Sequence, residues 1–135
     1  LYPTILDMAG VKQYNVPQTI DGVSIVPTLK GKADRRIADR SLIWNFPNVW
    51  DGYGPGINLN CAIRRGDWKL IYYYATGRKE LFNIAQDISE SRNLAEQYPA
   101  KVKQLSAELG KKLRSMNAQR PSFKTTGAAC KWPDE

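Results

Sequence analysis

The 135-residue sequence contains no histidine, and this single absence excludes several kinds of catalytic and metal site. Without an imidazole, neither a Ser-His-Asp nor a Cys-His nucleophilic site can form, and a metal has no imidazole ligand. The two cysteines, Cys61 and Cys130, are too few for a structural zinc site without histidine. We expect Cys61 to be a buried free thiol in a strand, although the sequence leaves one disulfide open.

Other motifs of catalysis are also missing. Gly52, Gly54 and Gly56 lie in a proline-containing loop and not between a strand and a helix, so they do not make a nucleotide-binding loop. The acidic residues are dispersed, which argues against a catalytic carboxylate pair. No apolar run approaches the ~20 residues of a membrane-spanning helix. We therefore predict no catalytic residue, no metal ligand and no membrane span in this chain.

The start of the chain lacks an initiator methionine and any signal-peptide pattern, and it opens inside an amphipathic segment. We interpret the chain as a piece of a longer protein, whose compartment this sequence does not reveal. The net charge of +7 would suit a free-standing module that binds a polyanion, either a sulfated glycan or nucleic acid. The basic residues are scattered and form no dense block. We therefore favour the view that the charge of this piece differs from the charge of the longer protein, and we expect no nucleic acid partner.

Periodicity and turn signals predict an α+β domain. Strands are expected over residues 41–46, 60–65, 68–74 and 79–84, and the short turns between the later strands indicate an antiparallel meander. The pair Gly66-Asp67 suits a type II′ hairpin turn. A long helix over residues 99–116 should pack on the sheet through one apolar stripe, formed by Val102, Leu105, Leu109, Leu113 and Met116. Residues 1–11 predict another helix, and residues 12–40 predict an extended connection with a helical turn near 26–29.

The strand at residues 68–74 has two partly apolar faces. Trp68, Leu70, Tyr72 and Tyr74 alternate with a second set that includes Ile71 and Tyr73. The first face suits the helix stripe, but the second is more apolar than a solvated face requires. We infer that the second face, with residues 1–30, meets a domain that is not part of this chain.

The long loop between the first two strands is the candidate binding site. Amides and aromatic rings on a loop are typical of sugar recognition, since rings stack on sugar faces and amides bond hydroxyl groups. An equally good alternative is that the rings only pin the loop to the sheet. Arg64, Arg65 and Lys69 could bind a sulfate group or simply line a solvated edge. The candidate substrate-binding residues are Asn45, Asn48, Trp50, Tyr53 and Arg64.

Four segments in order resemble the C-terminal end of the type I, formylglycine-dependent sulfatases. Residues 1–11 resemble the segment after that family's last metal-site residues, and residues 21–31 (DGVSIVPTLKG) resemble its "DG-x-S-L-x-P-L-L-x-G" stretch. Residues 62–71 (AIRRGDWKLI) are similar to its "AIR-x-GDWKLI" hairpin, and residues 80–95 to its "ELYNL-x-x-D-x-x-E-x-x-NLA" run. The tail resembles that of bacterial members that act on glycans or aryl sulfates.

The resemblance implies a two-domain parent. Residues 1–40 would end its alkaline-phosphatase-like catalytic domain, residues 41–116 would form the C-terminal subdomain of a sheet and a helix, and residues 117–135 would be a wrapping tail. The parent would use calcium and a formylglycine, act on a sulfated glycan or aryl sulfate, and, if bacterial, be periplasmic or secreted. Cys61 has no proline two positions on, so it is not the formylglycine precursor.

The implied role of this chain is a non-catalytic subdomain of a sulfuric ester hydrolase that completes the fold and borders the substrate cleft. Asn45 departs from the family, whose members often have histidine in the corresponding "WHFP" sequence. If that position contacts substrate, Asn45 would alter selectivity.

Overall fold

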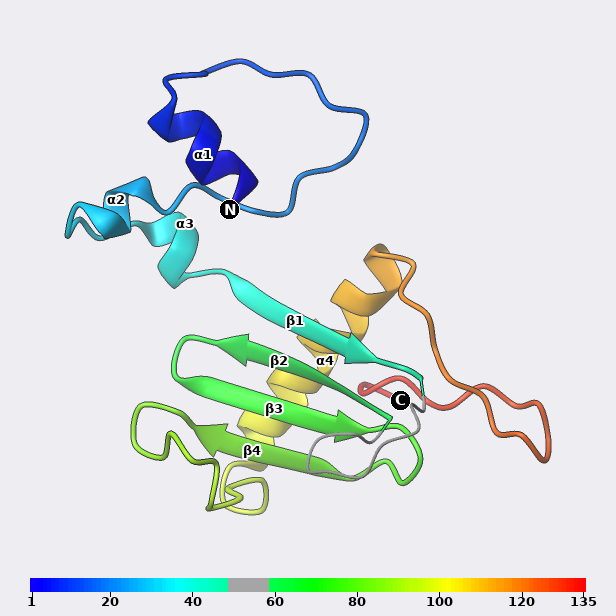
Figure 1. Cartoon of the computed structure of the whole chain (residues 1–135). Helices are drawn as coiled ribbons and strands as arrows, with labels where there is room; N and C mark the ends of the chain where they lie inside the picture. The colour runs from blue at the N-terminus through cyan, green and yellow to red at the C-terminus, as the bar shows by residue number, and fades with distance from the viewer. Residues whose placement is uncertain (49–58) are drawn as a thin grey trace. The chain divides into compact units, whose positions relative to one another are not determined.

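The computed structural model describes residues 1–48 and 59–135, and it divides into two compact units, Leu1–Arg40 and Ser41–Glu135. The division falls between Arg40 and Ser41. Each unit has its own internal packing and is described by itself. Figure 1 shows the elements of both.

The first unit contains three short helices, α1 (Tyr2–Met8), α2 (Val26–Leu29) and α3 (Arg35–Ala38). α1 ends before Gly10, whose φ of 73° is the left-handed conformation that glycine adopts without strain. α2 lies where a helical turn was expected. α3 was not expected, because its residues belong to a charged run interpreted as extended. It forms because the Asp34 side chain caps it, accepting a hydrogen bond of 2.9 Å from the Arg36 N–H.

The second unit is built on a four-stranded antiparallel sheet in the order β1-β2-β3-β4, which confirms the predicted meander. Its strands are β1 (Ser41–Phe46), β2 (Asn60–Arg65), β3 (Trp68–Tyr73) and β4 (Lys79–Asn83). Arg65 pairs with Trp68 across a two-residue turn. Only the first residue of that turn, Gly66, has a positive φ, of 58°, as a type II′ turn requires.

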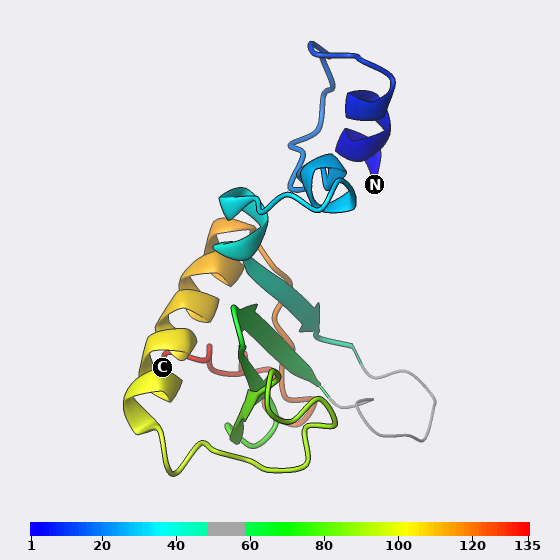
Figure 2. The same ribbon diagram turned by 90° about the vertical axis from the view of Figure 1, so that its left-hand side faces the viewer.

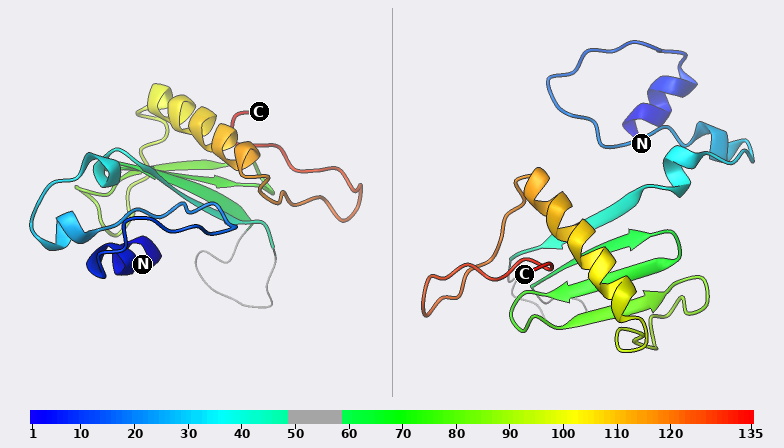
Figure 3. Two further views of the ribbon diagram at one scale, coloured as in Figure 1. Left: turned by 90° about the horizontal axis from the view of Figure 1, so that it is seen from above. Right: turned by 180° about the vertical axis from the view of Figure 1, so that it is seen from behind.

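Helix α4 (Pro99–Ser115) crosses one face of this sheet, as Figures 2 and 3 show. Proline suits the first helical turn, where its missing N–H leaves no hydrogen bond unmade. Of the predicted stripe, Leu105, Leu109 and Leu113 are buried in one cluster with strand residues such as Ile63 and Leu70. Full burial of one such side chain contributes about 1.5–3 kcal/mol, so this face holds the core of the unit. Val102 is partly buried, and Met116, beyond the end of the helix, is half exposed.

The tail after α4 contributes to the same core rather than lying loosely on the surface. Cys130, Trp132 and Pro133 are buried. The Tyr72 hydroxyl donates a hydrogen bond of 3.1 Å to the carbonyl of Lys131, and the Trp132 ring meets the Tyr74 ring edge-on at 6.4 Å. Both cysteines are free thiols, as expected for Cys61. Within residues 1–48 and 59–135, no helix is long and apolar enough to cross a membrane.

Candidate functional site

The face of the sheet opposite α4, called here the helix-free face, leaves large apolar side chains uncovered within this unit. Strand register places Leu42 beside Arg64 and Trp44 beside Ala62, and alternation along each strand puts all four on this face. Trp44 is 49% exposed and Leu42 is 38% exposed. The residues of the helix-free face are Leu42, Trp44, Phe46, Asn60, Ala62, Arg64, Lys69, Ile71, Tyr73, Glu80 and the buried Phe82.

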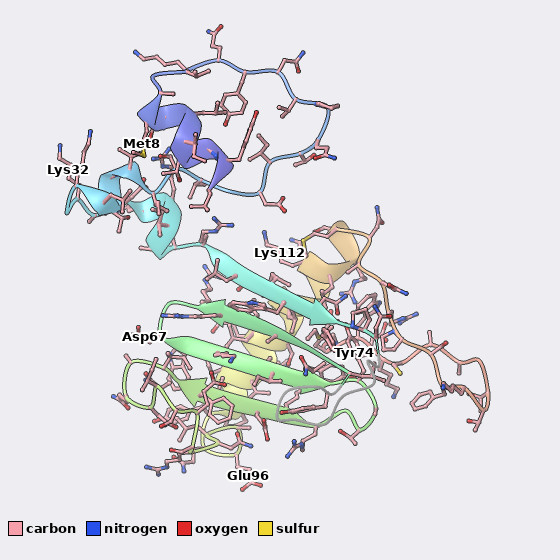
Figure 4. The ribbon with its side chains drawn as sticks, in the orientation of Figure 1. Met8, Lys32, Asp67, Tyr74, Glu96 and Lys112 are labelled. Atoms are coloured by element: carbon pink, nitrogen blue, oxygen red, sulfur yellow. The ribbon has the colours of Figure 1, made fainter. Side chains whose placement is uncertain are left out.

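Asn45 lies on the other face of the sheet and is held by two hydrogen bonds. The buried Tyr74 hydroxyl donates to Asn45 Oδ1 over 2.8 Å, and Asn45 Nδ2 donates to the carbonyl of Gln119 over 2.9 Å. Figure 4 labels Tyr74 at the end of the sheet near the tail. The two bonds fix the orientation of the Asn45 amide and tie the end of β1 to the tail. Among the described residues, these two bonds leave one amide hydrogen and one lone pair of Asn45 without a partner.

The side chains next to Asn45 are chemically inert at neutral pH. Cys61 is the register partner of Asn45 and has no exposed surface. Burial raises the pKa of the Cys61 thiol to about 12, although a hydrogen bond with Tyr74 opposes the rise. Burial and then the bond with Cys61 raise the pKa of Tyr74 as well. Neither group supplies a nucleophile or a general base, because the charged form of each is strongly disfavoured.

The three basic residues considered for sulfate binding differ in their partners. Arg65 forms an ion pair of 2.6 Å with Glu108 of α4, and Lys69 forms one of 2.6 Å with Glu90. Arg64 is exposed, and its Nε donates to the carbonyl of Gly66 over 3.2 Å. Among the described residues, no carboxylate pairs with Arg64. Its charge therefore remains available to an anion on the helix-free face.

The structure does not gather the predicted site residues into one cluster. The Asn45 side chain is on the α4 side, Arg64 is on the helix-free face, and the exposed Asn48 follows the end of β1. Trp50 and Tyr53 lie outside the described residues. The sequence did not reveal that Tyr74 and Gln119 hold Asn45, because the contact with Gln119 spans 74 residues and involves a backbone carbonyl.

The part of the chain that the structure describes offers no group of three or more His, Cys, Asp or Glu side chains that could hold a metal ion. Glu80, Glu90 and Glu108 near the sheet are already bound to cations or hydroxyls, as with Glu108, which accepts from Ser41 and Arg65. These residues do not fit a calcium site. Arg64 on the helix-free face and Asn48 after β1 can bind and orient a ligand, but the described residues near them offer no group to break a bond.

Comparison with known proteins gives consistent matches. Residues 1–119 match the family described as N-sulphoglucosamine sulphohydrolase, C-terminal. The chain is 35% identical to arylsulfatase K of Danio rerio, covering 86% of this chain and 21% of that protein. It is 31% identical to a sulfatase of Formosa agariphila, and the match covers 84% of this chain and 21% of that protein. It is 30% identical to choline-sulfatase of Rhizobium meliloti, and the match covers 90% of this chain and 22% of that protein. The chain thus spans about a fifth of the length of these relatives.

Solved structures share the fold. One is a protein in complex with its substrate D-glucosamine-2-N,6-O-disulfate (TM-score 0.61, 27% identity, 85% of this chain and 23% of that one). Another is Ps i-CgsB in complex with k-i-k-neocarrahexaose (TM-score 0.62, 25% identity, 90% and 24%). A phosphonate monoester hydrolase of Agrobacterium radiobacter, at 24% identity and a TM-score of 0.53 over 85% and 24%, shows the fold alone.

Proposed function

Because the chain belongs to the N-sulphoglucosamine sulphohydrolase C-terminal family, we propose that the whole protein is a sulfatase that hydrolyses a sulfate ester of a sugar. The chain itself is a C-terminal, non-catalytic part of such an enzyme. The observation that carries the proposal is the helix-free face, where uncovered Trp44 and Leu42 lie on the same face as the unpaired charge of Arg64. An apolar surface with one free cation suits a domain interface at the border of an anion-binding cleft.

The partner on the helix-free face is the catalytic part of the same protein. The relatives are about four times as long as this chain, so most of a parent protein remains to cover Trp44 and Leu42. In the first unit, Leu1, Ile5 and Met8 of the α1 region are also exposed, and we assign that apolar surface to the same partner.

The catalytic groups lie outside the described residues of this chain. Calcium and a formylglycine are the groups that a sulfatase of this type would use, to stabilise charge on the sulfate and to attack sulfur. Cys61 does not fit the formylglycine precursor, because it is buried in the core and lacks the required proline. The chain's own residues bind and orient: Arg64 attracts the sulfate, Asn48 reaches the sugar, and Asn45 supports the end of β1.

The substrate class is a sulfated saccharide. Two similar structures contain a saccharide, one of them a glucosamine disulfate. An aryl sulfate or choline sulfate is the second candidate, favoured by the names of the curated relatives. A phosphonate ester is a weaker candidate, because that comparison supports only the fold. A free-standing polyanion-binding module is the alternative if the chain acts alone.

The test is turnover by the whole protein of glucosamine 6-sulfate, p-nitrophenyl sulfate and a phenyl phosphonate, with release of sulfate or phenol measured. We expect the sugar sulfate to have the largest kcat/KM, and Arg64→Ala to raise KM about tenfold with little change in kcat. Lys124→Ala, an exposed charge in the tail, is the matched control. The absence of sulfate release from every sulfate ester would refute the proposal.

A further inference from the structure

A groove, separate from the Asn45 region, lies between the end of β4 and the start of α4. It has a volume of about 250 Å³ and is lined by Asn83, Gln86, Arg92, Leu94, Gln97 and Tyr98. β4 is the edge strand opposite β1, and Asn83 pairs with Trp68 beside the hairpin turn, whereas Asn45 lies toward the other end of the strands. Figure 4 labels Glu96 in the loop that forms one wall of this groove.

The wall of the groove is held in place by local hydrogen bonds. The Asp87 carboxylate accepts from the Arg92 N–H over 2.8 Å and from the Ser91 hydroxyl over 3.0 Å. Asn93 Oδ1 accepts from the N–H of Leu81 over 3.0 Å, which joins the loop to β4. A groove built this way is formed before any ligand arrives, so binding does not have to order the loop.

Two groups in the groove are unsatisfied. Among residues 1–48 and 59–135, Asn83 Oδ1 is buried without a hydrogen-bond partner. Because this atom has almost no accessible surface, a ligand in the groove meets the exposed side chains of the lining instead. The Arg92 guanidinium is exposed and forms no ion pair within residues 1–48 and 59–135. The one nearby carboxylate of the lining, Asp87, is already engaged by Ser91 and the Arg92 backbone.

We propose that this groove binds one sulfated sugar residue, at a site distinct from the Asn45 region. The Arg92 guanidinium binds the sulfate, and the exposed carboxamides of Gln86 and Gln97 bond the ring hydroxyls. The half-exposed ring of Tyr98, braced by Trp68 at 5.1 Å, offers an apolar surface to the sugar ring. The volume suits a single pyranose. The choice of a sulfated sugar rests on the proposed function.

The experiment is a titration of the ¹⁵N-labelled 135-residue chain with glucosamine 6-sulfate, glucosamine and inorganic sulfate, followed by backbone amide shifts. We expect saturable shifts at Gln86, Arg92 and Gln97, with glucosamine 6-sulfate binding at least tenfold more tightly than either other probe. Arg92→Ala should raise the Kd at least tenfold, and the charge-matched Lys111→Ala should leave it unchanged. Gln97→Leu should weaken binding of glucosamine 6-sulfate but not of inorganic sulfate, and a dispersed spectrum shows that each variant is folded.

Shifts spread over exposed lysines, or an unchanged Kd in Arg92→Ala, would overturn the proposal. Equal affinity for inorganic sulfate and glucosamine 6-sulfate would overturn the assignment of a sugar. The outcome is independent of turnover: groove binding without sulfate release by the whole protein would count only against the proposed function, whereas sulfate release without groove binding would count only against this site.

Discussion

The Asp134 carboxylate lies directly against the backbone of α4 at Gly110, so that a β-carbon on residue 110 would stand 1.9 Å from Asp134 Oδ1. The same carboxylate forms an ion pair with Arg114, one turn further along the helix. Glycine in a helix interior is unfavourable by about 1 kcal/mol relative to alanine. Here it makes room for the tail, and the tail in turn completes the core through Trp132 and Pro133.

Gly110→Ala should therefore destabilise the chain, against the usual effect of this substitution in a helix. The added methyl displaces Asp134 and breaks its ion pair, and overpacking of this kind costs about 1–3 kcal/mol, which exceeds the gain in helix propensity. Chemical denaturation measures the free energy of unfolding. Lys111→Ala, on the adjacent exposed position, should change it by less than about 0.5 kcal/mol.

A double-mutant cycle identifies the cause. In an Asp134→Ala background, Gly110→Ala should cost much less than in the wild-type chain, because the clashing carboxylate is gone. Additive effects would show that the glycine is required for another reason.

Asn45 and Tyr74 should act as a pair. Asn45→Ala leaves the buried Tyr74 hydroxyl without its acceptor, which should cost about 1–3 kcal/mol of stability. In the whole enzyme we predict that Asn45→Ala raises KM more than it lowers kcat. Tyr74→Phe should shift KM in the same direction by a smaller factor if Tyr74 orients Asn45. Unchanged kinetics in both variants, with stability lowered, would assign the pair a structural role only.

Stability should fall in alkaline solution. The pKa of Cys61 is about 12 in the folded chain and about 9 when exposed, so above pH 9 the unfolded state loses a proton that the folded state retains. The contribution of the buried, protonated Cys61 thiol to the free energy of unfolding is complete below pH 9. It is lost as the pH rises from 9 to 12 and amounts to something on the order of 4 kcal/mol in total. Tyr72 and Tyr74, whose pKa values burial also raises, add to the loss.

Denaturation at several pH values measures this loss. Cys61→Ala should reduce the slope above pH 9, and the range from pH 6 to 8 serves as the control, since neither state of Cys61 titrates there. A slope that is the same in Cys61→Ala would contradict the assignment.

Acid should destabilise the chain through two carboxylates. The hydrogen bonds from Arg114 lower the pKa of Asp134. For Glu108, burial raises the pKa, but bonds from Ser41 and Arg65 outweigh it and lower the pKa overall. Both carboxylates stabilise the folded chain at pH values above their ordinary pKa values, 3.8 for Asp134 and 4.5 for Glu108. This stabilisation is lost as the pH falls through their lowered pKa values in the folded chain. Glu108→Gln should flatten the dependence of unfolding free energy on pH below 4.5, and an unaltered profile would count against Glu108.

Patterns among residues close in sequence were enough to predict the secondary structure of the second unit and the antiparallel meander of its strands. The alternation in β3, the Gly66-Asp67 turn and the leucine stripe of α4 each involve near neighbours, and each predicted element of the second unit is present. α3 was missed because its signal is one capping side chain, Asp34, within a run that otherwise has the character of a linker.

The sequence by itself determined the α+β architecture, the absence of histidine chemistry and, through four ordered segments, the sulfatase family. Only the tertiary structure decided that the tail enters the core at Gly110, that Tyr74 and Gln119 hold Asn45, and that Asn45 and Arg64 face opposite sides of the sheet. The physical reason is that periodicity and turn residues act over a few positions. Side-chain partners 20 to 74 positions apart are chosen by packing, which leaves no regular pattern in the sequence.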